Sequence, residues 1–390
     1  MKILIAAAAP WSASAYGQQA GALAKHLGAE GHDVVYAVLN GLALGPLSYE
    51  GVTCIPAVNT PPESEITQAI RTFKPDILIT MVDLFVFQNF KPDIPWIAWF
   101  PVDTFPVSPV VLKILPRITV PISFSMDGAT AIHAIIGGIE ERGVTIRKCL
   151  YVPCMVEDEL MRSEKPTIEE QTAARHRIGV HQTHDVVVSI VADNNSLPSR
   201  KALPEQYVAF SLLREQYPEA ILYHHATPYS DRGGLNLIHL CDSLGLVPDR
   251  DVVYPPHYAY MNGLLDRSYV TAIYDASDVL FACSASEGFG IPIVEAQFRH
   301  RPAIVSDGIS MRPLATSQGL AATAGREWSA LQRSWWVRPH PRAITQRAIT
   351  AIQHPASCML GTHELDKYKA STVLQQWSII VNQTLMQPGA

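Results

Sequence analysis

The sequence predicts an α/β protein built from two Rossmann-like domains. Apolar runs of strand type and amphipathic segments of helix type alternate along almost the whole chain, which is typical of parallel sheets covered by helices. The alternation stops at residues 153–170, which contain two prolines and several acidic residues, and restarts with an apolar run at 186–191. The 390 residues are enough to bury two cores. We therefore expect domains at 1–155 and 156–360, followed by a final helical segment at 361–390.

The first domain is predicted as a regular series of strands and helices. We expect strands at 2–8, 33–39, 52–56, 76–80, 96–99, 118–123 and 149–152, and helices at 18–29, 63–73 and 128–142. Residues 1–15 are similar to a secretory signal peptide, because a lysine, an apolar run and small residues follow one another. We interpret this segment instead as a core strand, since Leu23 and Leu27 continue it as a helical stripe.

The second domain repeats the pattern. We expect strands at 186–191, 220–225, 251–254, 278–283 and 303–305, and helices at 203–216, 234–244, 268–276, 292–300, 341–353 and 363–385. The turn between the strand at 278–283 and the next helix contains residues that are suited to binding a ligand. Gly288 and Gly290 let the backbone take positive φ and approach a ligand, and Pro292 suits the start of the helix. The free N–H groups and the dipole of that helix attract phosphate.

Two carboxylates flank this turn. Glu287 lies in the turn and Glu295, eight residues later, is expected in the first helical turn. Carboxylates accept hydrogen bonds from sugar hydroxyls, so a phosphate site with two carboxylates indicates a sugar attached to a diphosphate. The alternative is that Glu295 only complements the helix dipole and Glu287 is an ordinary turn residue.

Residues 284–296, Ser-x-x-Glu-Gly-Phe-Gly-Ile-Pro-x-x-Glu-Ala, resemble the donor-binding signature of retaining GT-B glycosyltransferases, particularly glycosyltransferase family 4. Further similar segments are Tyr16-Gly17, Gly31–Val34, Arg200-Lys201 and Tyr274–Asp278, in the expected order. The resemblance implies two Rossmann-like domains that face each other across a cleft. It also implies a last helix that crosses back to the first domain, with Tyr368 and Trp377 as anchors.

The resemblance also implies which residues act on a nucleotide sugar. Arg200 and Lys201 would neutralise the two phosphates. Glu287 would contact the transferred sugar and Glu295 the nucleotide. The expected catalytic residues are Asp103, Arg200, Lys201 and Glu287. Further donor contacts are expected from Tyr16, Gly17, Asn195, His225, Gly288, Phe289, Gly290 and Ile291.

Two of these assignments have alternatives. Asp103 follows the strand at 96–99 and either orients a sugar or caps the turn. His225 and its neighbour His224 end a strand and are either metal ligands or residues that line the cleft. We favour the cleft, because no group of Cys, His or carboxylate residues at ligand spacing accompanies them.

The resemblance implies transfer with retention and without metal or other cofactor. The sequence offers no carboxylate pair suited to double displacement and no Asp-x-Asp element at a strand end. The sequence departs from the family pattern at two places, and these bear on the subfamily more than on the reaction. Phe298–Pro302 lacks the usual glycine before the proline, and Ser310–Leu314 lacks the usual acid. A sugar-nucleotide epimerase, a phosphorylase and a non-catalytic nucleotide-sugar-binding protein are the alternative functions.

Composition limits the partners. The net charge of −6 argues against a nucleic-acid scaffold, and the sequence lacks an apolar stretch that would span a membrane. The six cysteines show no paired spacing, which indicates free thiols and a cytoplasmic protein. The acceptor is open: a glycan, a protein, a small molecule or a modified nucleobase. Residues 299–347 carry eight arginines and two acidic residues, as either a partner surface or a solvated helix face.

Overall fold

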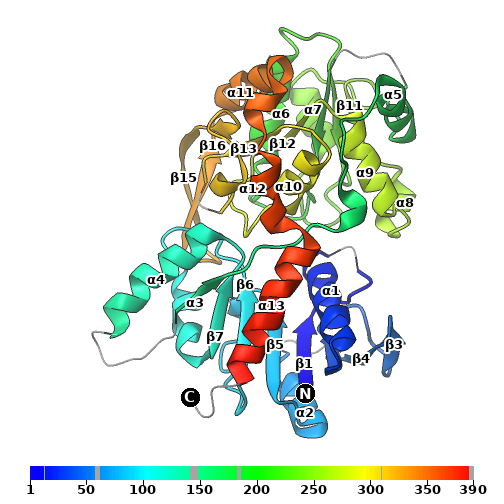
Figure 1. Ribbon diagram of the computed structural model, residues 1–390. Coiled ribbons are helices and arrows are strands. Elements are labelled where there is room, and N and C mark those ends of the chain that lie inside the picture. Colours follow the sequence, from blue (N-terminus) through cyan, green and yellow to red (C-terminus); the bar gives the residue numbers. More distant parts are fainter. Residues whose placement is uncertain (13, 58–61, 141–147, 182–185, 309, 386–390) are drawn as a thin grey trace. The chain divides into compact units, whose positions relative to one another are not determined.

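The computed structural model describes residues 1–12, 14–57, 62–140, 148–181, 186–308 and 310–385 (Figure 1). The chain divides into two compact units. Unit 1 comprises Met1–Met155, Ala330–Ser334 and Lys367–Ala390, and unit 2 comprises Val156–Ser329 and Trp335–Asp366. None of the described helices is both long and apolar enough to cross a membrane.

Unit 1 contains an eight-stranded sheet in the order β3-β4-β2-β1-β5-β6-β7-β8. Its strands are β1 (Lys2–Ala7), β2 (Asp33–Val38), β3 (Leu47–Tyr49), β4 (Val52–Pro56), β5 (Ile77–Met81), β6 (Trp96–Phe100), β7 (Val120–Ser123) and β8 (Leu150–Tyr151). Neighbouring strands are parallel, except that β3 pairs with β4 in the antiparallel sense. The predicted strands are confirmed, and β3 is an additional one. Its three residues are mostly exposed, so they leave no apolar pattern in the sequence.

The helices of unit 1 are α1 (Ala15–Ala29), α2 (Glu63–Phe73), α3 (Pro109–Ile114), α4 (Met126–Glu140) and α13 (Ala370–Leu385). The predicted start of α1 at residue 18 is corrected to Ala15, so Tyr16 and Gly17 lie inside the helix. Helix α3 was not predicted because its six residues are too few for a helical period. Ser108 caps it, since its hydroxyl accepts a hydrogen bond from the N–H of Val110 at 3.3 Å.

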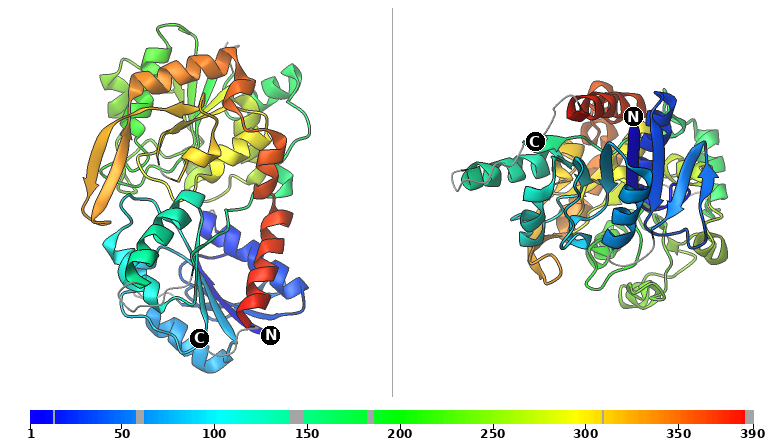
Figure 2. Two further views of the ribbon diagram at one scale, coloured as in Figure 1. Left: turned by 60° about the vertical axis from the view of Figure 1, so that its left-hand side comes forward. Right: turned by 90° about the horizontal axis from the view of Figure 1, so that it is seen from below.

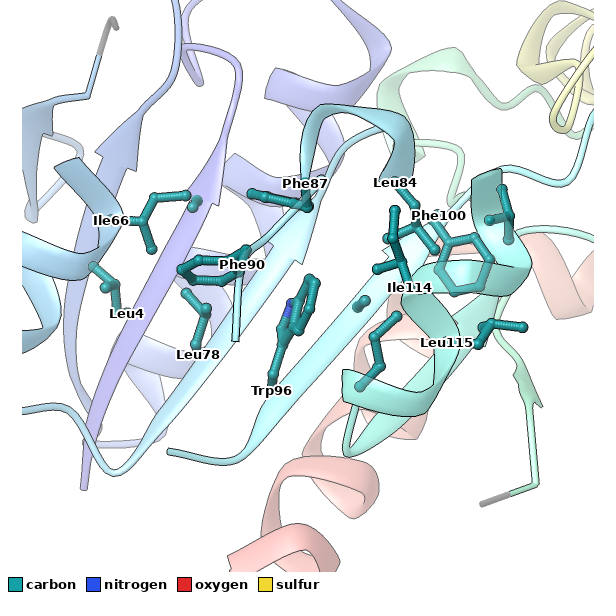
Figure 3. Packing of buried hydrophobic residues seen from close by; sticks show 14 of the residues in the cluster. Leu4, Ile66, Leu78, Leu84, Phe87, Phe90, Trp96, Phe100, Ile114 and Leu115 are labelled. Carbon is teal, nitrogen blue, oxygen red and sulfur yellow. The ribbon is translucent and has the colours of Figure 1, made fainter. Parts of the chain in front are cut away.

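One face of the unit 1 sheet is buried under large apolar side chains (Figure 3). The sheet contributes Leu78, Trp96 and Phe100, and the segment after β5 contributes Phe87. Trp96 packs edge-on against Phe87 with ring centroids 5.3 Å apart, and its indole N–H donates to the hydroxyl of Thr80 at 2.9 Å. A buried indole with a partner adds apolar contact without leaving an unpaired donor. This packing ties the start of β6 to β5 and to the segment that follows β5.

The C-terminal segment is split, not continuous as predicted for 363–385. Helix α12 (Thr362–Leu365) ends unit 2, a short 3-10 turn follows, and α13 belongs to unit 1. Figures 1 and 2 show α13 beside α1. Trp377 is fully buried against Trp99 with ring centroids 5.1 Å apart, and Tyr368 is also fully buried. The hydroxyl of Ser378 lies 2.8 Å from the ring of His26 in α1.

Unit 2 contains a six-stranded sheet in the order β11-β10-β9-β12-β13-β14, and every neighbouring pair is parallel. Its strands are β9 (Val187–Ile190), β10 (Ile221–His224), β11 (Val252–Val253), β12 (Val279–Ala282), β13 (Ala303–Ser306) and β14 (Leu320–Ala321). Together with the unit 1 sheet, this confirms the predicted α/β class with two Rossmann-like parallel sheets.

Helices cover both faces of the unit 2 sheet. They are α5 (Ile168–Arg177), α6 (Leu203–Leu213), α7 (Leu237–Ser243), α8 (His257–Met261), α9 (Arg267–Ala276), α10 (Ile291–Phe298), α11 (Pro341–Gln353) and α12. Val188 of β9 packs with α6 and α11, whereas the next residue along the strand, Val187, packs with α5 and α9. Helix α5 lies mostly beyond the stretch 153–170, in a segment for which no element is predicted from the sequence. It begins with a capping box formed by Thr167 and Glu170.

A separate two-stranded sheet completes the chain. It consists of β15 (Thr323–Ser329) and β16 (Ser334–Pro339), a pair that we call the hairpin (Figure 2, orange). No element between 305 and 341 is predicted from the sequence, so the hairpin is a correction. The β15 residues are mostly exposed, and the alternation expected of a half-buried strand is therefore weak.

Each large sheet has a point where the chain order reverses. In unit 1 the chain runs outward from β1 and restarts with β5 on the other side of β1. In unit 2 it runs outward from β9 and restarts with β12 on the other side of β9. Ligands of such sheets bind beyond the carboxyl ends of the strands at this switch point.

Candidate functional site

Two loops meet at the switch point of unit 2. One follows β9 and leads to α6, and the other follows β12 and leads to α10. The N–H of Ala285 donates to the carbonyl of Arg200 at 2.8 Å, so the loops are hydrogen-bonded to each other. Because β9 and β12 are neighbours in the sheet, residues far apart in sequence come together here.

The loops bring Arg200, Lys201 and Glu287 into one cluster. The guanidinium of Arg200 donates to the carbonyl of Ser286 at 2.8 Å and lies 3.4 Å from Oε2 of Glu287. The ammonium of Lys201 contacts the same carboxylate oxygen. Between 17% and 31% of each side chain remains exposed, so the charges are partly shielded but within reach of a ligand.

The cluster keeps Glu287 ionised. Burial alone would raise the pKa of this carboxyl, but the charges of Lys201 and Arg200 outweigh it and lower the pKa to about 2. The hydroxyl of Ser284 also donates to the carboxylate, at 3.4 Å. Burial lowers the pKa of Lys201, although the charge of Glu287 opposes this. With Arg200 and Lys201 both charged, the cluster carries more positive than negative charge, which favours an anionic ligand group such as phosphate.

The start of α10 adjoins this cluster. The expected donor contacts occupy consecutive positions there: Gly288, Phe289, Gly290 and Ile291. Gly290 is the glycine of the pair that takes the left-handed region, with φ of 107°. A Cβ on it would lie 2.6 Å from Cδ1 of Ile293, so the turn requires glycine. The helix begins at Ile291, so the predicted start at Pro292 is corrected by one residue.

Glu295 lies farther along helix α10 than predicted. It is the fifth residue of α10, whose first turn carries no acidic residue, so the interpretation as a first-turn dipole partner is wrong. Its side chain is 4% exposed and accepts a hydrogen bond from the hydroxyl of Tyr274 at 2.6 Å. Arg267 lies 3.5 Å from its other oxygen and 3.1 Å from Glu157. Burial raises the pKa of Glu295, although Arg267 and Tyr274 oppose this.

The missing glycine after α10 has a structural substitute. His300 takes φ of 58°, its N–H donates to Gln297, and the N–H of Arg301 donates to Ala296. These bonds form a Schellman motif, in which glycine usually holds the left-handed position. His300 fills that position and its ring lies 3.2 Å from the carbonyl of Arg162. The departure from the family pattern therefore affects the helix end.

The arginine-rich region 299–347 is only partly a surface, because other arginines are held inside unit 2 while four are exposed: Arg312, Arg326, Arg333 and Arg342. Arg299 and Arg301 are buried, and both bind Asp275, one through the carboxylate and the other through the carbonyl. Arg338 is held in ion pairs with acidic side chains of its own unit. Several of these arginines therefore hold unit 2 together.

Asn194 holds the loop after β9 and was missed by the sequence analysis. Its amide donates to the carbonyls of Thr227, Tyr229 and Leu235 at 2.7–3.3 Å. A Cβ on Gly234 would lie 2.2 Å from the backbone of Asn194, so glycine is required for this close approach. Asn195, the residue expected to bind the donor, is exposed and donates to Asp193 at 3.1 Å.

The two histidines at the end of β10 differ. His224 is fully buried, and its ring nitrogens lie 2.8 Å from the hydroxyl of Tyr207 and 3.0 Å from the carbonyl of Ala192. Both ring nitrogens of His224 are engaged in hydrogen bonds, which argues against the metal-ligand alternative for this residue. His225 packs edge-on against Tyr260, with centroids 5.2 Å apart. Burial lowers the pKa of both to about 4, so both are neutral at pH 7. Within the described ranges, no three His, Cys, Asp or Glu side chains are grouped to hold a metal ion.

The switch point of unit 1 brings Tyr16 to Asp83. The hydroxyl of Tyr16 donates to the carboxylate of Asp83, which follows β5, at 3.2 Å. Gly17 is needed for internal packing, because a Cβ there would lie 2.0 Å from the carbonyl oxygen of Ala9. Asp103 follows β6 and is half-buried, and both of its interpretations stay open. Asp83 was missed, although its position just after a strand was a usable signal.

No known family model and no curated protein sequence matches the chain. Its fold is similar to solved structures. A sucrose-phosphate synthase from Thermosynechococcus elongatus is 15% identical over 98% of both chains, with a TM-score of 0.69. HepE from Anabaena, solved in complex with UDP and glucose, is 16% identical over 98% of this chain and 100% of that chain, with a TM-score of 0.67. A glycosyltransferase from Rickettsia africae is 13% identical over 100% and 99%, with a TM-score of 0.66. The chain therefore has the two-domain GT-B fold of these glycosyltransferases.

Proposed function

We propose that this protein is a glycosyltransferase that moves a sugar from a nucleoside-diphosphate sugar to an acceptor and retains the anomeric configuration. The observation that carries the proposal is the cluster of Arg200, Lys201 and Glu287 at the switch point of unit 2. The similar fold of HepE, a protein solved with UDP and glucose, supports the same ligand class.

In this proposal the cations of the cluster bind the diphosphate. Arg200 donates two parallel hydrogen bonds to phosphate oxygens, and Lys201 adds a compact charge. The N–H groups that follow Gly290 at the start of α10 face the same phosphates. The cluster already holds one carboxylate, and a diphosphate brings more negative charge than Glu287 alone provides. The ligand therefore completes the neutralisation of both cations.

The two glutamates act on the sugar hydroxyls. Glu287 stays ionised beside its cations and accepts hydrogen bonds from the transferred sugar. Glu295 accepts from the nucleotide ribose, while Tyr274 and Arg267 hold its carboxylate in place. Because Glu295 is buried, its hydrogen bond with a hydroxyl is stronger than the same hydrogen bond would be in water.

The reaction that we propose breaks the bond between the anomeric carbon and the phosphate oxygen. The acceptor oxygen forms its bond on the same face, and the leaving phosphate oxygen takes the acceptor proton. Arg200 and Lys201 stabilise the charge that develops on the leaving diphosphate. We propose that no metal or cofactor takes part. All six cysteines are free and buried, which supports work in a reducing compartment such as the cytoplasm.

The test is a screen of the purified chain against UDP-, GDP- and ADP-sugars, read as nucleotide release with and without acceptors. We expect release from at least one donor, activity in excess EDTA, and a product whose new linkage keeps the donor's anomeric configuration by NMR. An inverted product or a requirement for manganese contradicts the mechanism. Conversion of the donor into an isomeric sugar nucleotide without acceptor would instead indicate an epimerase.

A further inference from the structure

The hairpin lies outside the proposed donor contacts, yet one side of it is fixed to them. Trp336 of β16 is 9% exposed and packs in one cluster with Ala202 and Ala285. Ala202 follows Lys201, and Ala285 lies in the loop of Glu287. The next residue of β16, Val337, donates its N–H to the carbonyl of Ala285 at 3.0 Å.

Arg338 adds a second attachment. Its guanidinium donates to the carbonyl of Ser199 at 3.0 Å and lies 2.5 Å from the carboxylate of Glu205 in α6. It also lies 3.2 Å from Glu327 of β15. The hairpin is therefore held against both loops of the switch point, and its outward residues have a fixed position beside the cluster.

The outward residues include an exposed pair of tryptophans. Trp335 points away from the side on which Trp336 is buried, as expected for successive residues of a strand. Trp328 is 51% exposed and Trp335 is 40% exposed, and their rings meet at 5.2 Å and 72°. Large aromatic side chains gain stability from burial, so two exposed indoles in contact indicate a binding surface.

We propose that Trp328 and Trp335 bind a pyranose ring of an oligosaccharide acceptor. The proposal rests on the glycosyltransferase function above. A pyranose has a face of C–H groups that stacks on an aromatic ring and a rim of hydroxyls. A T-shaped pair forms a corner, so one sugar ring contacts one indole with its face and the other with its edge. Arg326, which lies two residues before Trp328 on the same side of β15 and is exposed, supplies a polar partner for hydroxyls.

The small size of the surface favours a single sugar ring over other ligands. The two exposed indoles and the exposed Arg326, which lies on the same side of β15 as Trp328, form a small apolar corner with a polar neighbour. A lipid surface would need a broader apolar face. The net charge of −6 disfavours a nucleic acid.

The test measures binding of maltohexaose, cellohexaose, chitohexaose and isomaltohexaose to the full chain by calorimetry, without donor. We expect at least one to bind, and Trp328→Ala with Trp335→Ala to weaken it by roughly tenfold or more. Trp335→Tyr, which keeps an aromatic face, should retain most of the affinity. Nucleoside diphosphate affinity and the melting temperature should stay unchanged in all variants, which separates this surface from the donor site and from a folding defect.

Trp11→Ala is the matched control, because Trp11 is 37% exposed and packs against Tyr49 in unit 1. It should leave oligosaccharide binding intact. The proposal is overturned if no oligosaccharide binds, if the double variant binds as well as the wild type, or if the tryptophans serve only binding to phosphatidylglycerol vesicles. If oligosaccharide binding depends on the pair but no sugar nucleotide is turned over, the glycosyltransferase function fails and the sugar-binding surface stands.

Discussion

The two switch points share a topology but differ in their chemistry. In unit 2 the loops after β9 and β12 bring together Arg200, Lys201 and Glu287. In unit 1 the first turn of α1 and the loop after β5 bring together a phenol and a carboxylate, Tyr16 and Asp83. The parallel sheet supplies the place in both units, and the side chains decide what binds there. A cationic cluster fits a diphosphate, whereas a phenol and a carboxylate fit the hydroxyls of an uncharged ligand.

The largest expected effect tests this division of roles. Arg200→Ala with Lys201→Ala removes both cations, so binding of nucleoside diphosphate should weaken by about a hundredfold or more, measured by calorimetry. Asp83→Asn in unit 1 should leave that affinity unchanged. Equal losses from both changes would show that the two switch points do not divide the ligand in this way.

Glycines at the two switch points should respond differently to a methyl group. Gly17→Ala places Cβ 2.0 Å from the carbonyl oxygen of Ala9, so unfolding free energy should fall by about 3 kcal/mol. In Gly290→Ala, the new Cβ lies 2.6 Å from the end of the Ile293 side chain, which can move away, but φ of 107° is strained for alanine. The change should therefore lower unfolding free energy by about 1–2 kcal/mol and weaken nucleotide binding. Gly28→Ala is the control, because no atom lies within 4 Å of its Cβ position. Chemical denaturation measures all three, and a Gly17→Ala protein as stable as wild type would refute the packing role.

The carboxylates of unit 2 should give opposite pH dependence. The folded-state pKa of Glu287 is lowered to about 2, so its stabilisation is complete above the ordinary value of 4.5 and disappears as pH falls from 4.5 to 2. Compared with Glu287→Gln, the wild type should therefore lose about 2 kcal/mol across that range. The pKa of Glu295 is raised by burial, so the wild type should gain stability relative to Glu295→Gln as the pH falls. Denaturation at several pH values measures the difference in unfolding free energy between the wild type and each variant. If that difference changed with pH in the same direction for Glu287→Gln and Glu295→Gln, the opposite pKa shifts of the two carboxylates would be contradicted.

The smallest effect separates stability from binding. Thr167→Ala removes the cap of α5, and Ser108→Ala removes the cap of α3. Each should lower unfolding free energy by about 1 kcal/mol without changing nucleotide affinity. A cap change that weakened nucleotide binding as strongly as the loss of Arg200 and Lys201 would mean that general destabilisation explains the binding results.

Much of the fold and part of the site followed from local signals. Apolar runs predicted the parallel strands, and the Gly-Phe-Gly-Ile-Pro turn predicted where α10 starts. Glu287 and Lys201 were predicted to act on the same ligand, but not to contact each other directly, because that contact arises from the adjacency of β9 and β12. Local pattern also could not reveal that Glu295 is held by Arg267, which precedes it by 28 residues.

The hairpin shows a second limit of sequence reasoning. The residues of β15 are mostly exposed, so the hydrophobic period that identifies strands is weak there. The arginines near it were counted as surface charge, but Arg338 binds Glu205 and Glu327 inside unit 2. A count of charges along a chain does not show which of them are already paired.

The most direct measurement is hydrogen exchange of the full chain with and without UDP, GDP or ADP. The account predicts that at least one nucleotide protects the backbone at 193–201 and 284–296, the two loops of the unit 2 switch point. It also predicts that Arg200→Ala with Lys201→Ala abolishes this protection. Protection by a nucleotide that appears only in the unit 1 loops, or that survives the double substitution unchanged, would contradict the account.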